Sequence, residues 1–190
     1  MDLIYTLYSN ERTVFRLKDV AMLTGETKFS SLNMKLNYYV RTGRLRNPRK
    51  GLYCKPDYNP QELACRIFTP VYISLEYVLQ RAGVIFQYDS RFTMLTCLSR
   101  ELEIEGNIYS FRKIKNELLV SQKGIVQQGN TLTIATPERA FLDMLYLNGA
   151  MYFDNLRPLK KELIEAILPV YNSKTLEKRV TKILKDHGLS

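Results

Sequence analysis

The spacing of apolar residues changes its period several times along the chain, and each change marks an expected element. Residues 1–26 predict two short helices, the second in "FRLKDVAMLTG", whose apolar positions recur at helical spacing until Gly25. After a turn at residues 26–28, a further helix is expected to begin near Ser30 or Ser31, because either side chain can cap the first backbone N–H groups. The apolar face of this helix consists of Phe29, Leu32, Leu36, Tyr39 and Val40.

A basic hairpin is expected after Gly43, which ends this helix. The segments 45–46 and 52–54 predict short strands on either side of the turn "NPRKG". A helix, a turn, a second helix and a hairpin follow one another in this order in a winged helix-turn-helix. Residues 59–68 predict one more helix, and Thr69 before Pro70 marks a boundary because proline disfavours helix in the preceding residue.

The second half of the chain predicts a mixed set of elements. Residues 73–83 predict a helix capped by Ser74. Four strand-like segments follow, at 91–100, 107–115, 117–124 and 130–136. Helices are expected from Thr136-Pro137, around 157–168 and around 174–187. We therefore expect an α+β protein with an N-terminal winged helix-turn-helix DNA-binding domain at 1–69 and a mixed α/β C-terminal domain at 70–190.

Charge is concentrated in the first of these domains. The chain has 28 Lys plus Arg against 19 Asp plus Glu, a net charge of +9. Eight of the cations lie in residues 27–55, which contain no acidic residue, so the rest of the chain is nearly balanced. A solvated charged face normally mixes both signs, so an acid-free stretch that coincides with a helix-turn-helix pattern favours nucleic-acid binding.

The helix near residues 30–41 has an outer face suited to a DNA major groove. Serines at its amino end suit phosphate oxygens, Arg41 and Lys35 suit guanine, Asn37 suits adenine, and Met34 suits a thymine methyl group. The alternative for Met34 and Tyr38 is a second packing surface. The candidate DNA-binding residues are Ser30, Ser31, Lys35, Asn37, Tyr38, Arg41, Arg44, Arg46, Arg49 and Lys50.

A second group of cations lies in the last expected helix, away from its apolar positions. They are Lys174, Lys178, Arg179, Lys182 and Lys185. A solvated helix face is one interpretation of this group. The other interpretation is a surface for an acidic partner or RNA.

Several segments together resemble the AbiEi-like antitoxins of type IV toxin–antitoxin and abortive-infection systems. The resemblance covers most of the chain and rests on three motifs. The first is a wing with Gly43, Arg44, Leu45, Arg49, Gly51 and Tyr53. The second is a helix with Ile73, Ser74, Glu76 and Leu79, and the third is a T-P-E-R-x-x-L-D segment with Thr136 to Arg139, Leu142 and Asp143.

This resemblance implies a repressor that binds its own promoter as double-stranded DNA. It also implies that the C-terminal domain opposes a nucleotidyltransferase-like toxin, as a functional rather than a stable physical partner. The basic group of the last helix is then a possible antitoxin surface. From the residues alone, Arg139 and Asp143 are interpreted as a surface i,i+4 pair of small value, and Ser74 as an N-cap.

Other functions find less support in the sequence. A restriction-type, metal-dependent nuclease would need clustered acids and lysine, but Asp57, Asp89, Glu103 and Glu105 show no acid–x–Lys spacing. Three cysteines without CxxC spacing and a single histidine, His187, predict reduced thiols and no zinc site. A purely protein-binding module is a further alternative. We expect no enzyme activity and no cofactor.

The location of the protein is also an expectation from the sequence. No apolar run approaches the length that spans a bilayer, and the first ten residues have no basic segment, so we expect a cytoplasmic protein without membrane contact. The sequence leaves the oligomeric state open.

Overall fold

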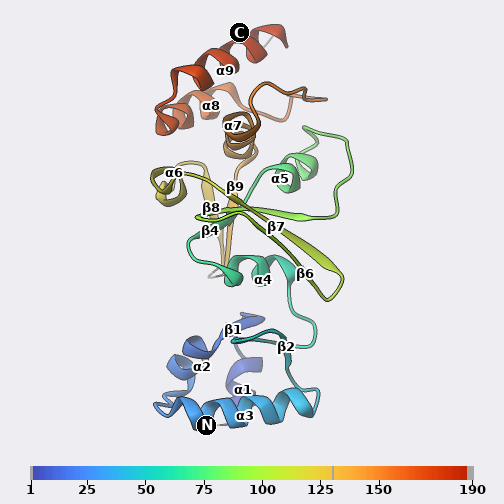
Figure 1. Ribbon diagram of the computed structural model, residues 1–190, viewed down its shortest axis with the longest axis vertical. Coiled ribbons are helices and arrows are strands. Elements are labelled where there is room, and N and C mark those ends of the chain that lie inside the picture. The colour runs from blue at the N-terminus through green and yellow to red at the C-terminus, as the bar shows by residue number, and fades with distance from the viewer. Residues whose placement is uncertain (1, 130, 188–190) are drawn as a thin grey trace. The chain divides into compact units, whose positions relative to one another are not determined.

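The chain divides into two units, which are described separately. The computed structural model describes residues 2–129 and 131–187. Unit 1 runs to Thr69 and includes residues 104–106, and unit 2 begins at Pro70. Each unit combines helices with one β-sheet, so the fold is of mixed α and β type (Figure 1). Throughout the described residues, every helix is too short or too polar to span a bilayer.

Unit 1 packs its helices against a three-stranded sheet of order β1-β3-β2. Leu7, Phe15, Val20, Leu32 and Leu36 are fully buried and belong to its core. The elements of the unit are α1 (Leu3–Tyr8), β1 (Val14–Arg16), α2 (Leu17–Thr24), α3 (Phe29–Arg41), β2 (Arg46–Arg49), β3 (Leu52–Cys54) and α4 (Pro60–Ile67).

The first 26 residues contain the two expected helices and a strand that the sequence pattern did not predict. β1 is only three residues long and passes directly into α2, so its period of two is too short to stand out. Gly25 ends α2 as expected, with a φ of 68° that a residue with a Cβ adopts less easily.

The expected start of α3 is wrong by one or two residues. The helix begins at Phe29, and its N-cap residue Lys28 makes no side-chain capping hydrogen bond. Ser30 and Ser31 lie inside the first turn and do not cap it. Phe29 is 52% exposed instead of buried, because the core begins one turn later, at Leu32.

The basic hairpin has a tighter turn than expected. β2 and β3 pair antiparallel, with Arg49 opposite Leu52, so only Lys50 and Gly51 connect them. Gly51 has a φ of 81°, which suits a two-residue hairpin loop. Pro48 lies within β2, and an edge strand tolerates it because its missing N–H is not needed by a further strand.

Unit 2 is built on a mixed six-stranded sheet of order β6-β7-β5-β4-β9-β8. Its strands are β4 (Val71–Ile73), β5 (Phe92–Thr96), β6 (Arg100–Ile104), β7 (Asn107–Lys113), β8 (Ile125–Gln128) and β9 (Leu132–Ala135). Its helices are α5 (Glu76–Arg81), α6 (Asn116–Val120), α7 (Pro137–Asn148), α8 (Lys161–Ile167), the 3-10 helix η1 (Leu168–Tyr171) and α9 (Lys174–Asp186). α7 packs against α5, α8, α9 and β9 (Figure 1).

Three expectations for unit 2 are wrong. Ile73 ends a strand, and α5 starts only at Glu76, so Ser74 does not cap it. The segment 117–124 is mainly the helix α6, because it buries the adjacent Leu118 and Leu119, which successive positions of a strand would place on opposite faces. The strands β4, β6 and β8 were not predicted.

Candidate nucleic-acid interface

The two faces of α3 differ in burial and chemistry. Leu32 and Leu36 are fully buried on one face. On the opposite face Met34 is 68% exposed and Tyr38 is 53% exposed, so neither residue packs in a core. Asn37 and Arg41 are exposed beside them. The outer face of α3 therefore presents apolar, aromatic, amide and cationic groups to solvent.

The amino end of α3 carries Ser30 and Ser31 in its first turn. Ser30 is exposed and Ser31 is half-buried. The first N–H groups of any α-helix lack partners within the helix and carry the positive end of its dipole, so this end favours an anion. Neither serine is the N-cap residue of the helix, which is Lys28.

Four cations follow along the hairpin, and two of them have partners within unit 1. Arg44, Arg46 and Lys50 are exposed, whereas Arg49 is half-buried, with its guanidinium carbon 6.0 Å from the centre of the Phe68 ring. Arg46 forms an exposed ion pair of 3.1 Å with Glu105. Arg44 and Lys50 are thus the less constrained cations of the hairpin.

The hairpin is braced by neutral hydrogen bonds. The Asn47 side-chain amide donates to the Leu52 carbonyl at 2.6 Å and to the Arg49 carbonyl at 3.1 Å. The Tyr53 hydroxyl lies 3.2 Å from Asn33 Oδ1 and links β3 to α3. Asn33 had no role in the sequence reasoning, because its partner is 20 residues away. These bonds hold the basic tip of the hairpin in place beside the helix.

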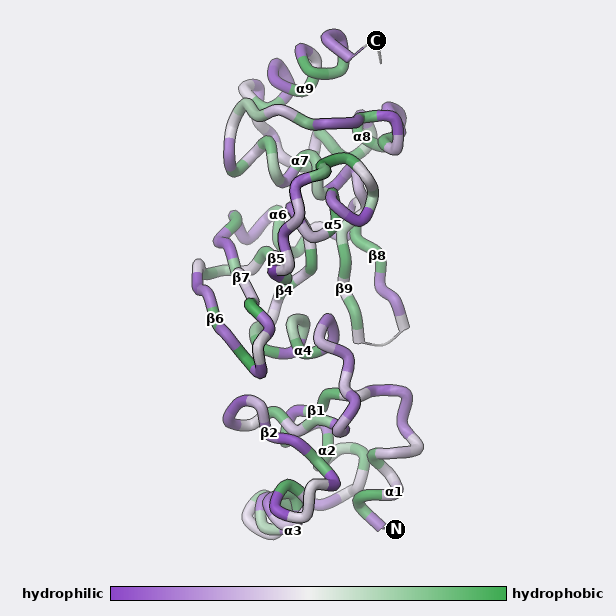
Figure 2. Tube along the Cα trace, turned by 90° about the vertical axis from the view of Figure 1, so that its right-hand side faces the viewer, coloured by the Kyte–Doolittle hydropathy of each residue, from purple (hydrophilic) through white to green (hydrophobic). Residues whose placement is uncertain are grey.

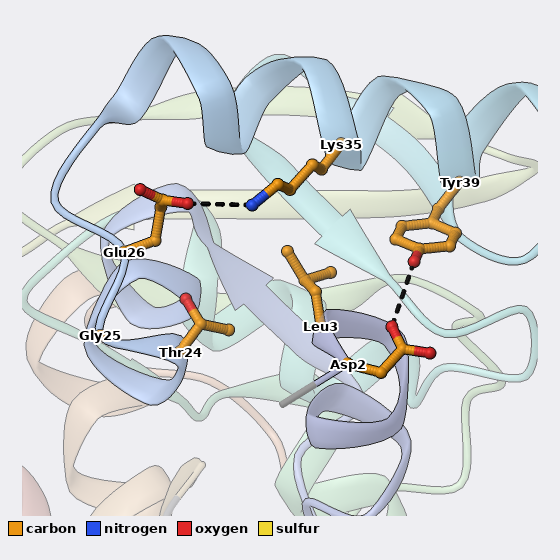
Figure 3. Close-up of a pocket in the computed structure, with 7 residues that line it drawn as sticks. All are labelled: Asp2, Leu3, Thr24, Gly25, Glu26, Lys35 and Tyr39. Atoms are coloured by element: carbon orange, nitrogen blue, oxygen red, sulfur yellow. Dashed lines mark hydrogen bonds and ion pairs between the residues drawn. The ribbon is translucent and has the colours of Figure 1, made fainter.

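Lys35 occupies the flank of α3 rather than its outer face. Its ammonium lies 3.0 Å from a Glu26 carboxylate oxygen in the turn between α2 and α3 (Figure 3). One helical turn later, the Tyr39 hydroxyl donates to Asp2 Oδ1 at 3.3 Å. These groups line an open pocket of about 450 Å³, together with Leu3, Thr24 and Gly25. Of the candidate residues on α3, Lys35 has an acidic partner.

Lys55, the last cation of the acid-free stretch, serves the fold. Its ammonium donates to the Asn10 carbonyl at 2.6 Å and to the Tyr8 carbonyl at 3.3 Å. It therefore ties the end of β3 to the segment after α1.

The five cations of α9 differ in exposure and in their contacts. Lys174, Lys178, Lys182 and Lys185 are exposed, and Figure 2 shows hydrophilic and hydrophobic residues alternating along this helix. Arg179 is half-buried, and its guanidinium donates to the carbonyl of Leu145 in α7 at 3.2 Å. Arg179 thus holds two helices together, while the four lysines face solvent.

Arg139 and Asp143 form a buried ion pair, and their expected place on the surface is wrong. Both side chains have no exposed surface, and Arg139 Nε lies 3.2 Å from Asp143 Oδ1. Arg139 also donates to the Leu118 and Lys123 carbonyls and to the Tyr72 hydroxyl. The pair is buried because α7 turns this side toward the core, which i,i+4 spacing alone does not reveal.

Hydroxyl groups complete the shell of Asp143. Tyr171 donates at 2.6 Å, Ser74 at 2.8 Å and Tyr72 at 3.1 Å. Burial raises the pKa of Asp143 above its usual value, although Arg139 and the three hydroxyl donors act to lower it. Burial lowers the pKa of Arg139, but Asp143, Tyr171 and Tyr72 together outweigh burial and raise this pKa above its usual value. Two motifs of the family resemblance, those of Ser74 and of Arg139 with Asp143, thus meet in the core of unit 2.

Two of the four acids considered for metal-dependent chemistry, Asp89 and Glu105, have other partners. Glu105 accepts hydrogen bonds from Arg46 and Tyr58, and Asp89 holds Arg91 through both carboxylate oxygens. Among residues 2–129 and 131–187, no group of three or more His, Cys, Asp and Glu is arranged to hold a metal ion. Among the described residues, Cys54, Cys65 and Cys97 form no disulfide, and burial raises the pKa of Cys54 to about 12.

Comparison with known proteins gives no independent guide to this surface. No protein-family model matches the chain, and no curated protein matches it.

Proposed function

We propose that unit 1 is a winged helix-turn-helix and binds double-stranded DNA. In this proposal α2 and α3 form the helix-turn-helix, α3 enters the major groove, and the hairpin of β2 and β3 is the wing. The order of these elements along the chain supports the assignment. The turn residues 25–28 separate the two helices, and Gly43 leads from α3 into the hairpin.

The observation that carries the proposal is the chemistry of the outer surface of α3. Exposed Met34 and Tyr38 lie among Asn37 and Arg41, in a stretch of 29 residues without an acid. A solvated helix face gains no stability from large apolar groups exposed beside its cations. A major groove accepts both, because it presents thymine methyl groups as well as hydrogen-bonding base edges.

Each group of residues has a separate role in this proposal. Arg41 and Asn37 read base edges, while Arg44, Arg49 and Lys50 contact phosphates. Ser30 and Ser31 place a phosphate at the amino end of α3. Arg49 is stacked on Phe68, which limits its motion and favours a fixed phosphate contact.

The biological setting that we propose follows from the family resemblance. The protein represses its own promoter through unit 1, and unit 2 opposes a nucleotidyltransferase-like toxin. The exposed lysines of α9 are the candidate surface for that second task. Gene neighbourhood bears directly on this proposal, since it requires a nucleotidyltransferase reading frame beside the gene.

DNA binding is tested by titrating the purified protein with its own promoter and with random duplex at several salt concentrations. If about five cations contact phosphates, the logarithm of the binding constant should fall against the logarithm of salt with a slope of roughly −4 to −5. The promoter should also bind more tightly than random DNA. A slope near zero, or equal affinities for the two duplexes, contradicts the proposal.

A further inference from the structure

Glu26 is the last acid before the acid-free stretch, and its carboxylate is used twice. One oxygen lies 3.0 Å from the Lys35 ammonium. The other accepts the backbone N–H of Lys28 at 3.3 Å, at the N-cap position of α3. Figure 3 shows the side chain directed from the α2–α3 turn across the pocket toward Lys35. The turn before the proposed recognition helix therefore supplies a counter-charge to one of its cations.

The pair is accessible to solvent, so an outside anion can compete for Lys35. The Lys35 side chain is 53% exposed and that of Glu26 is 25% exposed. The hydrogen bond from Lys35 is the main cause that lowers the pKa of Glu26. Glu26 therefore remains ionised at neutral pH, and its charge opposes the transfer of Lys35 to a phosphate.

We propose that Glu26 is a positioning residue that holds Lys35 away from DNA and thereby lowers the affinity of unit 1 for every duplex. This inference rests on the proposed DNA binding. A phosphate that recruits Lys35 must displace the Glu26 carboxylate, and phosphates carry no sequence information. The reduction is therefore the same factor for promoter and random DNA.

The effect is bounded by the strength of an exposed ion pair. Such pairs change a binding constant by roughly fivefold at most. Recruitment of one more cation by phosphate also adds about 0.9 to the salt slope. These two quantities together distinguish the release of Lys35 from a general change in net charge.

The test compares Glu26→Gln with Glu11→Gln in the full chain. Glutamine keeps the shape and the acceptor for the Lys28 N–H but removes the charge. Glu11 is exposed in the same unit and forms no ion pair among the described residues, so its substitution changes net charge equally. For Glu26→Gln we expect two- to fivefold tighter binding of both duplexes, an unchanged promoter-to-random ratio and a salt slope steeper by about 0.9. Glu11→Gln should leave the slope unchanged.

A second pair of proteins shows whether the effect passes through Lys35. In a Lys35→Gln background, Glu26→Gln should change affinity no more than Glu11→Gln does. If Glu26→Gln equals Glu11→Gln in the natural background, or keeps its larger effect without Lys35, the role of Glu26 is overturned while DNA binding stands. If the unsubstituted protein shows no salt-dependent DNA binding, the proposed function fails, and this inference with it.

Discussion

The cations of α3 and its hairpin in unit 1 differ sharply from the ion pair of α7 in unit 2. Arg41, Arg44 and Lys50 extend into water. Arg139 is fully buried, with a carboxylate, a hydroxyl and two carbonyl groups around its guanidinium. The first set remains available to an external anion. The second is already bound to the protein itself.

Desolvation explains why the two regions use charge so differently. A cation left in water keeps its hydration, so a surface can carry several without acidic partners. A buried charge loses its hydration and is tolerated only with an opposite charge and with hydrogen bonds for its remaining groups. Asp143 and Arg139 satisfy this requirement with partners from five segments, including β4 and η1. The charges of Arg139 and Asp143 therefore stabilise the fold of unit 2. The exposed cations of unit 1 remain available to an external anion.

The largest predicted effect concerns the buried ion pair of Arg139 and Asp143. Asp143→Asn keeps the shape of the side chain but leaves Arg139 buried without its counter-charge. We expect a loss of about 3–5 kcal/mol in the free energy of unfolding, measured by urea denaturation.

Lys161 and Glu165 offer a matched control, because they form an exposed i,i+4 pair at 4.0 Å in the same unit. Glu165→Gln should change the free energy of unfolding by less than about 0.5 kcal/mol. If Asp143→Asn costs less than about 1 kcal/mol, Asp143 is neutral in the folded protein and the description of an ion pair is wrong.

The next prediction distinguishes the proposed base contacts of α3 from the proposed phosphate contacts of the hairpin. Asn37→Ala or Arg41→Ala should lower the preference for promoter over random DNA by about 1–3 kcal/mol, because a bidentate base contact is lost. Arg49→Ala and Lys50→Ala should weaken both duplexes by similar factors and flatten the salt slope. Binding titrations with both duplexes measure these changes. Similar losses of preference in both groups of variants would mean that α3 does not read bases.

The sequence predicted helices whose apolar stripe or capping residues lie close together in the chain. The stripe of Leu32 and Leu36, ended by Gly43, predicts α3, and Thr136 before Pro137 predicts the start of α7. The cap at Thr136 is confirmed, since its hydroxyl accepts the N–H of Arg139 at 3.2 Å. These features depend on residues within one or two helical turns of each other.

The burial of Arg139 and Asp143 depends on distant residues and was not predicted. Their i,i+4 spacing is the same as that of the exposed pair Lys161 and Glu165. What distinguishes the two pairs is Tyr72, which lies 71 residues from Asp143 in the chain. Ser74 was misinterpreted for the same reason, since its partner Asp143 is 69 residues away. The counter-charge of Lys35 was also not predicted, because Glu26 lies one residue before the acid-free stretch 27–55.

The smallest predicted effect concerns two adjacent residues of α9. Arg179→Ala removes the hydrogen bond to the Leu145 carbonyl, so we expect a loss of about 0.5–1.5 kcal/mol in the free energy of unfolding. Lys178→Ala removes only an exposed side chain and should stay within about 0.5 kcal/mol. Urea denaturation of the two variants provides the measurement. Equal losses would show that Arg179 does not hold α9 to α7.

The difference between half-buried Arg179 and the exposed lysines of α9 determines how the proposed antitoxin surface should be tested. A charge reversal that includes Arg179 would lower stability as well as change the surface, so a failure to protect cells would have two explanations. Lys178→Glu combined with Lys182→Glu changes exposed positions alone. If these lysines contact an acidic partner or RNA, the double variant should stay folded, keep its affinity for the promoter and lose protection against the toxin. Full protection by the double variant would assign the lysines of α9 to a solvated helix face.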